Sequence, residues 1–183
     1  MIKNMIKIKN NELSFYKEAF ELDVNSPSGL RWKTRPRNHF ATDGAMKKMN
    51  SQYAGKLAGT KTSHGYWQVQ AGRQIGAHRV VWSLFHDQEL GEFVIDHIDG
   101  NSLNNSIQNL RKATFAENSR NRKVSKSKKI QLKGIHKHKG KFRASIYALG
   151  KKYGLGTFVT QEAAHEAYCN AAKEVHGTFA RYN

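Results

Sequence analysis

The sequence predicts an α+β protein built from small modules of short strands and helices, and three observations lead to this class. Short apolar runs that alternate with polar residues and end in glycine turns are typical of hairpin strands, as in residues 93–100. Apolar residues spaced three or four positions apart are typical of helices, as in residues 79–85 and 163–175. The length of 183 residues, with 38% hydrophobic content, suits one domain or two small ones.

Residues 1–62 are expected to contain an N-terminal hairpin followed by a connector. Apolar residues recur at helical spacing from Leu13 to Phe20, which favours a short helix. Residues 20–23 and 30–33 alternate apolar with polar side chains around a dense turn cluster, as the strands of a hairpin do. The basic connector from Arg35 to Lys61 contains several glycines, so we expect it to be irregular.

Residues 63–123 are expected to form the next module. Residues 79–85 are apolar enough for a buried helix, and the apolar run 93–95 is typical of a half-buried strand. Thr114 and Glu117 have the spacing of a capping box, which predicts that a second helix begins there.

Two polar residues stand where the strand 93–95 ends. Asp96 offers a hard oxygen ligand and His97 an imidazole, and the two should point to opposite sides because side chains alternate along a strand. Asp99 and Gly100 then form a strong turn signal. An Asp-His pair beside such a turn is also typical of a polar hairpin end, so the pair alone does not establish an active site.

The polar segments that follow favour an active site over a polar hairpin end, because they resemble those of a known family. Four segments agree in order and spacing with the HNH endonuclease family, namely Asp96-His-Ile-Asp-Gly-Asn101, Asn104-Asn105, Asn109-Leu-Arg111 and Glu117-Asn118. They resemble the phage and intron-associated branch of that family, in which the third signature residue is often Asn instead of His. The resemblance covers roughly residues 65–123 and implies a ββα-metal nuclease core, also called a His-Me finger.

The resemblance also implies a role for each signature residue. His97 would be the general base that activates water, and Asn109 would orient its ring. Asp96 and Asn118 would hold one divalent ion, with Asn121 as the rival for the second position. One carboxylate and one amide leave room for water and a phosphate oxygen, so we expect Mg²⁺, with Mn²⁺ as the alternative.

Other polar residues near the signature have two interpretations. His78 matches the His-Arg that precedes the active-site strands in this branch, where it would contact phosphate or water near the metal. A structural histidine at a strand-to-helix junction fits His78 equally well. Asp99, Asn104 and Asn105 are expected to cap turns and brace the loop.

Charge and cysteine content narrow the range of partners. Lys and Arg number 31 against 14 Asp and Glu, and the formal net charge of +17 predicts attraction to a polyanion such as double-stranded DNA. No apolar run approaches the roughly 20 residues that span a bilayer, so no membrane partner is expected. Cys169 is the only cysteine, which excludes an internal disulfide and a Cys-x-x-Cys zinc site and favours a packing role.

The basic residues concentrate toward the C-terminus. From Ser119 to Gln161 there are 13 Lys or Arg residues in 43 positions and no Asp or Glu. Residues 124–132, which are rich in Lys and Ser, are expected to form a basic linker along a DNA backbone. Residues 133–183 are expected to form three short antiparallel strands with glycine turns, followed by a helix whose small apolar residues let it lie close to the sheet.

This C-terminal unit resembles the DNA-binding domain of the plant ethylene-response transcription factors. The segments that carry the resemblance are Lys133-Gly-Ile, Lys141-Phe-Arg-Ala, Leu155-Gly-Thr-Phe158, Glu162-Ala-Ala, Ala167-Tyr168 and His176-Gly-Thr-Phe-Ala. That domain places its sheet in the major groove, so the resemblance implies base or phosphate contacts; a basic sheet that only clamps phosphates is the alternative. The candidates for DNA contact are Arg120, Arg122, Lys123, Lys126, Lys128, Lys137, Lys141, Arg143, Tyr147 and Lys152.

Together these features predict a metal-dependent DNA endonuclease, similar to the free-standing homing endonucleases of phages that nick or cut a long target. We expect a monomer or weak dimer on DNA, encoded by a phage and acting in the cytoplasm of the bacterial host. The alternatives are a catalytically inactive DNA-binding regulator and an RNA-binding, ribosome-associated protein.

Overall fold

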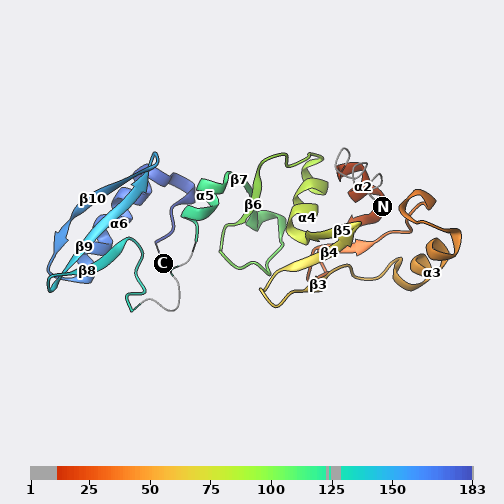
Figure 1. The fold of residues 1–183 in the computed structure, drawn as a ribbon, viewed down its shortest axis with the longest axis horizontal. Coiled ribbons are helices and arrows are strands. Elements are labelled where there is room, and N and C mark those ends of the chain that lie inside the picture. The colour runs from red at the N-terminus through yellow and green to blue at the C-terminus, as the bar shows by residue number, and fades with distance from the viewer. Residues whose placement is uncertain (1–11, 123, 125–128, 183) are drawn as a thin grey trace. The chain divides into compact units, whose positions relative to one another are not determined.

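The computed structural model describes residues 12–122, 124 and 129–182 of the chain. Contacts between residues divide the chain into two units, Met1–Ala113 and Thr114–Asn183, and each unit is described by itself. Both units contain helices and short antiparallel sheets, which confirms the mixed α and β composition that the sequence predicts (Figure 1).

The described part of the first unit begins with the predicted helix and hairpin. Helix α2 (Glu12–Ala19) leads directly into β1 (Phe20–Leu22), which pairs with the antiparallel strand β2 (Leu30–Trp32). Phe20 and Leu30 are buried in the core, whereas Leu22 at the end of β1 is exposed, so the alternation of the sequence marks the inward face of this hairpin only in part.

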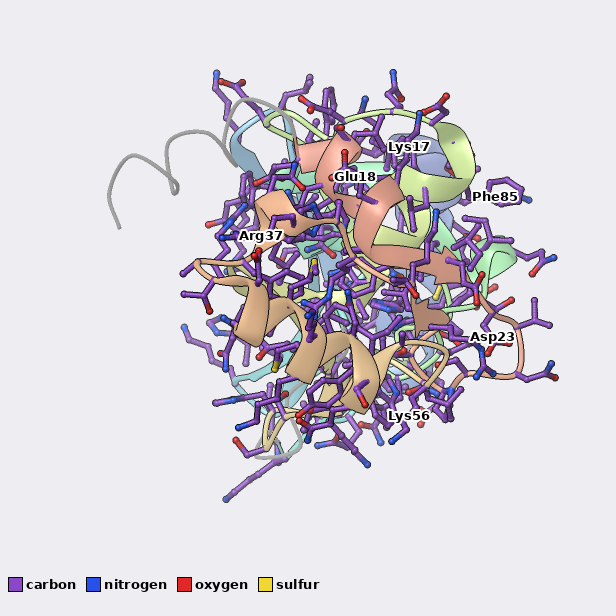
Figure 2. All side chains as sticks on the ribbon, turned by 90° about the vertical axis from the view of Figure 1, so that its right-hand side faces the viewer. Lys17, Glu18, Asp23, Arg37, Lys56 and Phe85 are labelled. Atoms are coloured by element: carbon purple, nitrogen blue, oxygen red, sulfur yellow. The ribbon has the colours of Figure 1, made fainter. Side chains whose placement is uncertain are left out.

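The connector that follows is more regular than predicted. It contains the short 3₁₀ helix η1 (Arg37–His39), the helix α3 (Asp43–Tyr53) and the strand β3 (Thr60–Lys61). The Thr42 side chain caps α3 by accepting a hydrogen bond from the backbone of Ala45, and Arg37, beside this helix in Figure 2, forms an ion pair with Asp43. No residue of α3 is buried, so the helix lacks the apolar stripe by which a sequence reveals one.

A three-stranded sheet and a buried helix make up the middle of the first unit. Strand β4 (Trp67–Ala71) lies between β3 and β5 (Arg73–Gly76), and α4 (Ala77–His86) follows at once. Helix α4 contributes Val80, Val81 and Trp82 to the core, as its apolar sequence predicts. Phe85, near its C-terminal end, is at the surface instead (Figure 2).

A second hairpin ends the first unit. Strand β6 (Val94–His97) pairs with β7 (Leu110–Ala113), and the short 3₁₀ helix η2 (Ile107–Asn109) stands just before β7. Ile95 and Leu110 are buried in the same core as α4. The hairpin is therefore anchored at the point where it carries Asp96 and His97.

The second unit starts with α5 (Phe115–Arg120), whose predicted capping box between Thr114 and Glu117 is confirmed. Three antiparallel strands follow in the order β10-β9-β8, with β8 (Ile135–His138), β9 (Lys141–Ala148) and β10 (Lys151–Phe158). Helix α6 (Gln161–His176) and the 3₁₀ helix η3 (Gly177–Phe179) complete the unit. This is the predicted sheet of three strands packed on one helix.

Helix α6 lies against the sheet through small residues. Ala164, Tyr168 and Ala172 are buried, and Tyr168 and Ala172 pack with Ile146 of β9. Gly134 permits a particularly close approach, because a Cβ atom there would lie 1.9 Å from Tyr168 Cδ2, and its φ of 78° also suits glycine.

Candidate active site

Asp96 and Arg111 form a buried ion pair across the β6–β7 hairpin. They are directly opposite in the strand register, and Arg111 Nε and Nη2 lie 2.8 and 2.7 Å from Asp96 Oδ2. Asp96 is 4% exposed, so its carboxylate is held away from bulk solvent. The guanidinium compensates for the lost hydration and stabilises the charged carboxylate, the form that binds a divalent ion.

His97 is held by a chain of two hydrogen bonds. Its Nε2 lies 3.1 Å from Asn105 Oδ1, and Asn105 Nδ2 donates to the carbonyl oxygen of Ser28 at 2.9 Å. Because a carbonyl oxygen only accepts, the amide NH₂ must face Ser28 and the amide oxygen must face His97. Nε2 of His97 therefore carries the hydrogen, and the neutral ring has its lone pair on Nδ1.

Asn105 contacts the candidate base in a way that its place in the sequence does not indicate. The sequence predicts a residue that braces the loop, whereas in the structure Asn105 is 5% exposed and makes the hydrogen bond to His97. Its second bond reaches Ser28, 77 positions earlier in the chain. The Asn104-Asn105 pair was visible in the sequence, but nothing local distinguishes the buried member from a turn residue.

Asn109 fixes the turn that follows His97. Its Nδ2 donates to Asp99 Oδ1 at 3.0 Å and to the carbonyl oxygen of Asn104 at 2.8 Å, while its Oδ1 accepts from the backbone N–H of Asp99 at 3.0 Å. Burial raises the pKa of Asp99, but hydrogen bonds from Asn101, Asn104 and Asn109 outweigh it and lower that pKa. The loop role expected of Asp99 and Asn104 agrees with these bonds, and the orientation of the His97 ring by Asn109 stays a prediction.

Two aromatic rings pack around His97. The ring of His78 is edge-on to it with centroids 5.0 Å apart, and the ring of Tyr66 lies 6.3 Å from His97 and 5.8 Å from His78. His78 stands at the junction of β5 and α4, so it occupies the predicted structural position and also borders the candidate base. A Cβ atom on Gly76 would lie 2.5 Å from His78 Cε1, so glycine leaves the room that the His78 ring takes up.

His78 is an uncharged neighbour of His97. Its Nδ1 is buried without a hydrogen-bond partner. Burial, with smaller contributions from the charges of His97 and Arg79, lowers the pKa of His78 to about 3. The ring is therefore neutral near pH 7 and places no positive charge beside His97.

The predicted second metal ligand belongs to the second unit. Asn118 lies in α5, and Asn121, its rival, is the C-cap of that helix. Asn121 is 6% exposed, and its Oδ1 is 3.4 Å from Arg181 Nη1. Asp96 lies in the first unit, so its pairing with either asparagine stays a prediction.

The donor set fits a hard cation. Among the residues that the structure describes, no group of three or more His, Cys, Asp or Glu side chains is placed to hold a metal. A carboxylate together with an amide oxygen, completed by water and phosphate oxygens, suits Mg²⁺ or Mn²⁺ and is a poor set for zinc.

The predicted DNA-contacting residues of the sheet are exposed. Lys137, Lys141, Arg143 and Lys152 point to solvent, and Tyr147 is 67% exposed. Within the segment after α5, Arg120 is half-buried and Arg122 is exposed. The remaining candidates lie outside the described residues; they are Lys123, Lys126 and Lys128.

Comparisons with known proteins place the chain in a family. The family described as HNH endonuclease matches residues 76–120, from the end of β5 through α5. The chain belongs to this family, because it is also similar to a relative over most of that relative's length. That relative is Protein 3.8 of Escherichia phage T7, which is 36% identical over 107 residues, 57% of this chain and 88% of Protein 3.8.

A viral protein is also similar to the chain. Uncharacterized HNH endonuclease L560 of Acanthamoeba polyphaga mimivirus is 34% identical over 108 residues, which are 58% of this chain and 56% of that protein. The chain thus spans little more than half of this relative. No solved structure matches the chain.

Family membership indicates a nuclease, whose substrate is a nucleic acid, and HNH nucleases generally use a divalent metal. In the part of the chain that the structure describes, none of the helices is both long and apolar enough to span a membrane.

Proposed function

We propose that this chain is a metal-dependent DNA endonuclease of the free-standing homing type, which nicks or cuts double-stranded DNA. The observation that carries the proposal is the hydrogen-bond chain that sets the lone pair of His97 on Nδ1, one residue from the buried carboxylate of Asp96. The phage and viral relatives support a phage-encoded protein that acts in the cytoplasm of a bacterial host.

In the proposed reaction, His97 Nδ1 takes a proton from the water that attacks phosphorus. Nε2 donates to Asn105 both before and after this transfer, so the amide oxygen keeps the ring in place and stabilises the positive charge that it gains. General base catalysis of this kind typically contributes about 10²–10⁴-fold to the rate.

Asp96 and Asn118 are proposed to hold one Mg²⁺ ion, with Mn²⁺ as the alternative ion and Asn121 as the alternative ligand. When bound, the ion stabilises the negative charge that develops on the leaving 3′ oxygen. Arg111 holds the Asp96 carboxylate in a fixed orientation on the hairpin. The family signature supports this ligand set.

The exposed basic residues of the second unit are proposed to bind double-stranded DNA, with the chain acting as a monomer or weak dimer. Lys137, Lys141 and Arg143 offer positive charge along the sheet without neighbouring acids in sequence. The three antiparallel strands on one helix support the proposed likeness to the plant ethylene-response domain.

Incubation of supercoiled plasmid with the protein and Mg²⁺ tests the proposal. The wild type should convert the plasmid to nicked or linear forms, and His97→Ala should bind DNA as tightly but cleave at least about 100-fold more slowly. His64→Ala is the matched control, because His64 is an exposed histidine of the same unit and should be dispensable.

A wild-type protein that binds DNA but never cuts it with Mg²⁺ or Mn²⁺ would be a DNA-binding regulator. One that prefers RNA and cleaves neither nucleic acid would fit the ribosome-associated alternative. In either case the endonuclease proposal fails.

A further inference from the structure

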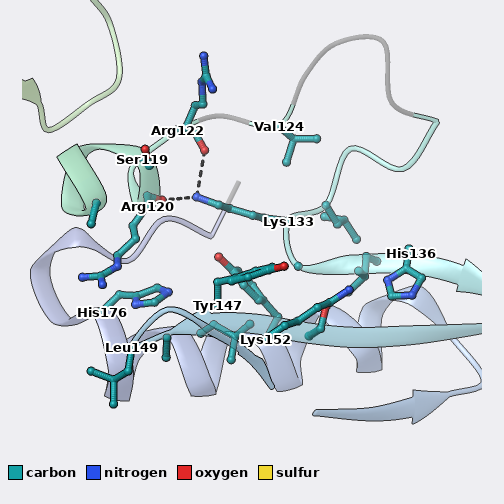
Figure 3. Close-up of a pocket in the computed structure, with 18 of the residues that line it drawn as sticks. Ser119, Arg120, Arg122, Val124, Lys133, His136, Tyr147, Leu149, Lys152 and His176 are labelled. Atoms are coloured by element: carbon teal, nitrogen blue, oxygen red, sulfur yellow. Dashed lines mark hydrogen bonds between the residues drawn. The ribbon is translucent and has the colours of Figure 1, made fainter. Parts of the chain in front are cut away.

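The second unit contains a cleft between the residues that follow α5 and the end of its sheet (Figure 3). Its volume is about 950 Å³. Strand β8 pairs with β9 no further than Ile135 opposite Ala144, so the edge of β9 at residues 146–148 extends past β8 and borders the cleft. A hollow of this size accommodates a nucleotide-sized ligand.

The side chains that line the cleft favour an anion. Arg120, Arg122, His136 and Lys152 border it, and none of the described lining residues is acidic. Lys133 also faces it, with Nζ donating to the carbonyl oxygens of Arg120 and Arg122. The charges of Arg120, Arg122 and Lys152, without acids beside them, produce a positive potential that attracts phosphate groups.

His176 lines one side of the cleft, beside Arg120 in Figure 3. It is 9% exposed, so its ring forms part of the wall of the cleft.

Tyr147 gives the cleft an aromatic surface. Its neighbours Ile146 and Ala148 are buried on the α6 side, so Tyr147 points the other way and is 67% exposed. Lys152 is its cross-strand partner, and the two lie together in Figure 3. Gly154 stands two positions after Lys152 in β10. A Cβ atom there would meet nothing within 4 Å, so the surface beside the Tyr147 ring is open.

We infer that this cleft binds unpaired nucleotides of single-stranded DNA, with a base stacked on Tyr147 and the adjacent phosphates held by Arg122 and Lys152. Exposed aromatic rings beside basic side chains are the usual means of binding single strands. In a duplex the bases stack on each other and cannot lie on a ring inside a hollow, whereas an unpaired base can.

The inference goes beyond the proposed function, which needs only duplex contacts, and rests on it only in taking DNA as the ligand. It assigns the second unit a preference for sites where the strands are already separated. Basic sheet residues outside the cleft, such as Arg143, remain the proposed duplex contacts.

Binding of single-stranded and duplex DNA by the full chain tests this inference. The ligands are a fluorescein-labelled oligothymidylate of about 12 nucleotides and a duplex of the same length. All proteins carry His97→Ala and are measured in EDTA, so the result does not depend on cleavage. Tyr147→Ala should weaken oligothymidylate binding about ten-fold, while Tyr147→Phe, which keeps the ring, should remain within about two-fold.

Tyr153→Ala is the matched control, because Tyr153 is also exposed but stands opposite Ile146 and so faces the other side of the sheet. It should leave both affinities unchanged. Arg143→Ala, outside the cleft, should weaken duplex binding more than single-strand binding.

Three results would overturn the inference: Tyr147→Ala weakening both ligands equally, Tyr147→Ala weakening neither, or tighter Tyr147-dependent binding of oligouridylate than of oligothymidylate. If the plasmid stays uncut but the single-strand result holds, the endonuclease proposal fails and the assignment of the cleft stands.

Discussion

The two units differ in the burial and pairing of their polar side chains. In the first unit, the two residues at the centre of the candidate site are buried and each has a defined partner, Asp96 in Arg111 and His97 in Asn105. In the second unit, basic side chains such as Arg143 are exposed on the sheet. No acidic residue stands between positions 119 and 161 to pair with them in sequence.

The difference corresponds to two physical tasks. Proton transfer and metal binding require atoms held to within about an ångström, which buried hydrogen bonds provide. Attraction to a polymer of phosphates requires exposed charge, and this attraction weakens with salt. Substitutions in the first unit should therefore change rate and stability, and those in the second should change affinity.

The largest effect is expected for Arg111→Met, which leaves the buried Asp96 carboxylate without its guanidinium. It should lower the free energy of unfolding by about 3 kcal/mol, and Mg²⁺ should restore part of this loss. Tryptophan fluorescence during urea unfolding measures the first unit alone, because Trp32, Trp67 and Trp82 are the chain's three tryptophans.

Arg37→Met is the control for this prediction, because the ion pair of Arg37 with Asp43 is exposed. Its loss should cost less than about 1 kcal/mol. Equal losses for the two variants would mean that burial of Asp96 does not matter, and the contrast between the units would weaken.

The next effect concerns Asn105, whose loss frees the His97 ring from its acceptor. Asn105→Ala should lower kcat for plasmid cleavage about 100-fold with little change in the Kd for DNA. Asn105→Asp keeps an acceptor for Nε2 and should retain more of the rate. Gln108→Ala, an exposed amide nearby, serves as the control, and an unchanged kcat in Asn105→Ala would remove Asn105 from the mechanism.

The pH dependence of stability should reveal the buried His78. Its pKa is lowered to about 3 in the folded protein, so the unfolded chain binds more protons below the ordinary histidine pKa. Stability attributable to His78 is thus complete above about pH 6.5 and falls by up to about 1.4 kcal/mol per unit as the pH drops toward 3.

His78→Phe keeps a ring against His97 and should remove this part of the pH dependence in urea unfolding followed by tryptophan fluorescence. His64→Gln, at an exposed position, should leave the profile unchanged. Parallel profiles for the wild type and His78→Phe would contradict the assignment of a neutral, buried His78.

The smallest effect is expected for single basic residues of the sheet. Arg143→Ala should weaken duplex binding a few-fold and reduce the slope of log K against log salt by about 1, without changing thermal stability. Lys173→Ala removes the same charge from α6 and should leave the slope unchanged. A loss of stability in Arg143→Ala would show that this residue is structural.

The elements that the sequence predicts are those with local signals. The capping box of Thr114 and Glu117 marks α5, and the alternation around residues 20–32 marks the first hairpin. Helix α3 has a capping residue in Thr42 but no apolar stripe, because none of its residues is buried. It is held instead by contacts between distant residues, such as the hydrogen bonds between Asn50 and the backbone of Arg35.

The same distinction applies at the candidate site. Asp96 and His97 follow from one strand and its turn, and both are found buried where that strand ends. The contacts that orient His97 come from Tyr66, His78 and Asn105, which reach it through the tertiary fold. No short pattern encodes such contacts, so spacing alone could not assign them.

The two bonds from Lys133 also join separate elements of the second unit. Its ammonium group donates to the carbonyl oxygens of Arg120 and Arg122, at the end of α5, while Lys133 itself stands just before β8. Extra residues inserted between Arg122 and Lys133 would leave both bonds in place, and each doubling of loop length costs only about 0.6 kcal/mol. An insertion at this point should therefore cost little stability as long as the lysine is kept.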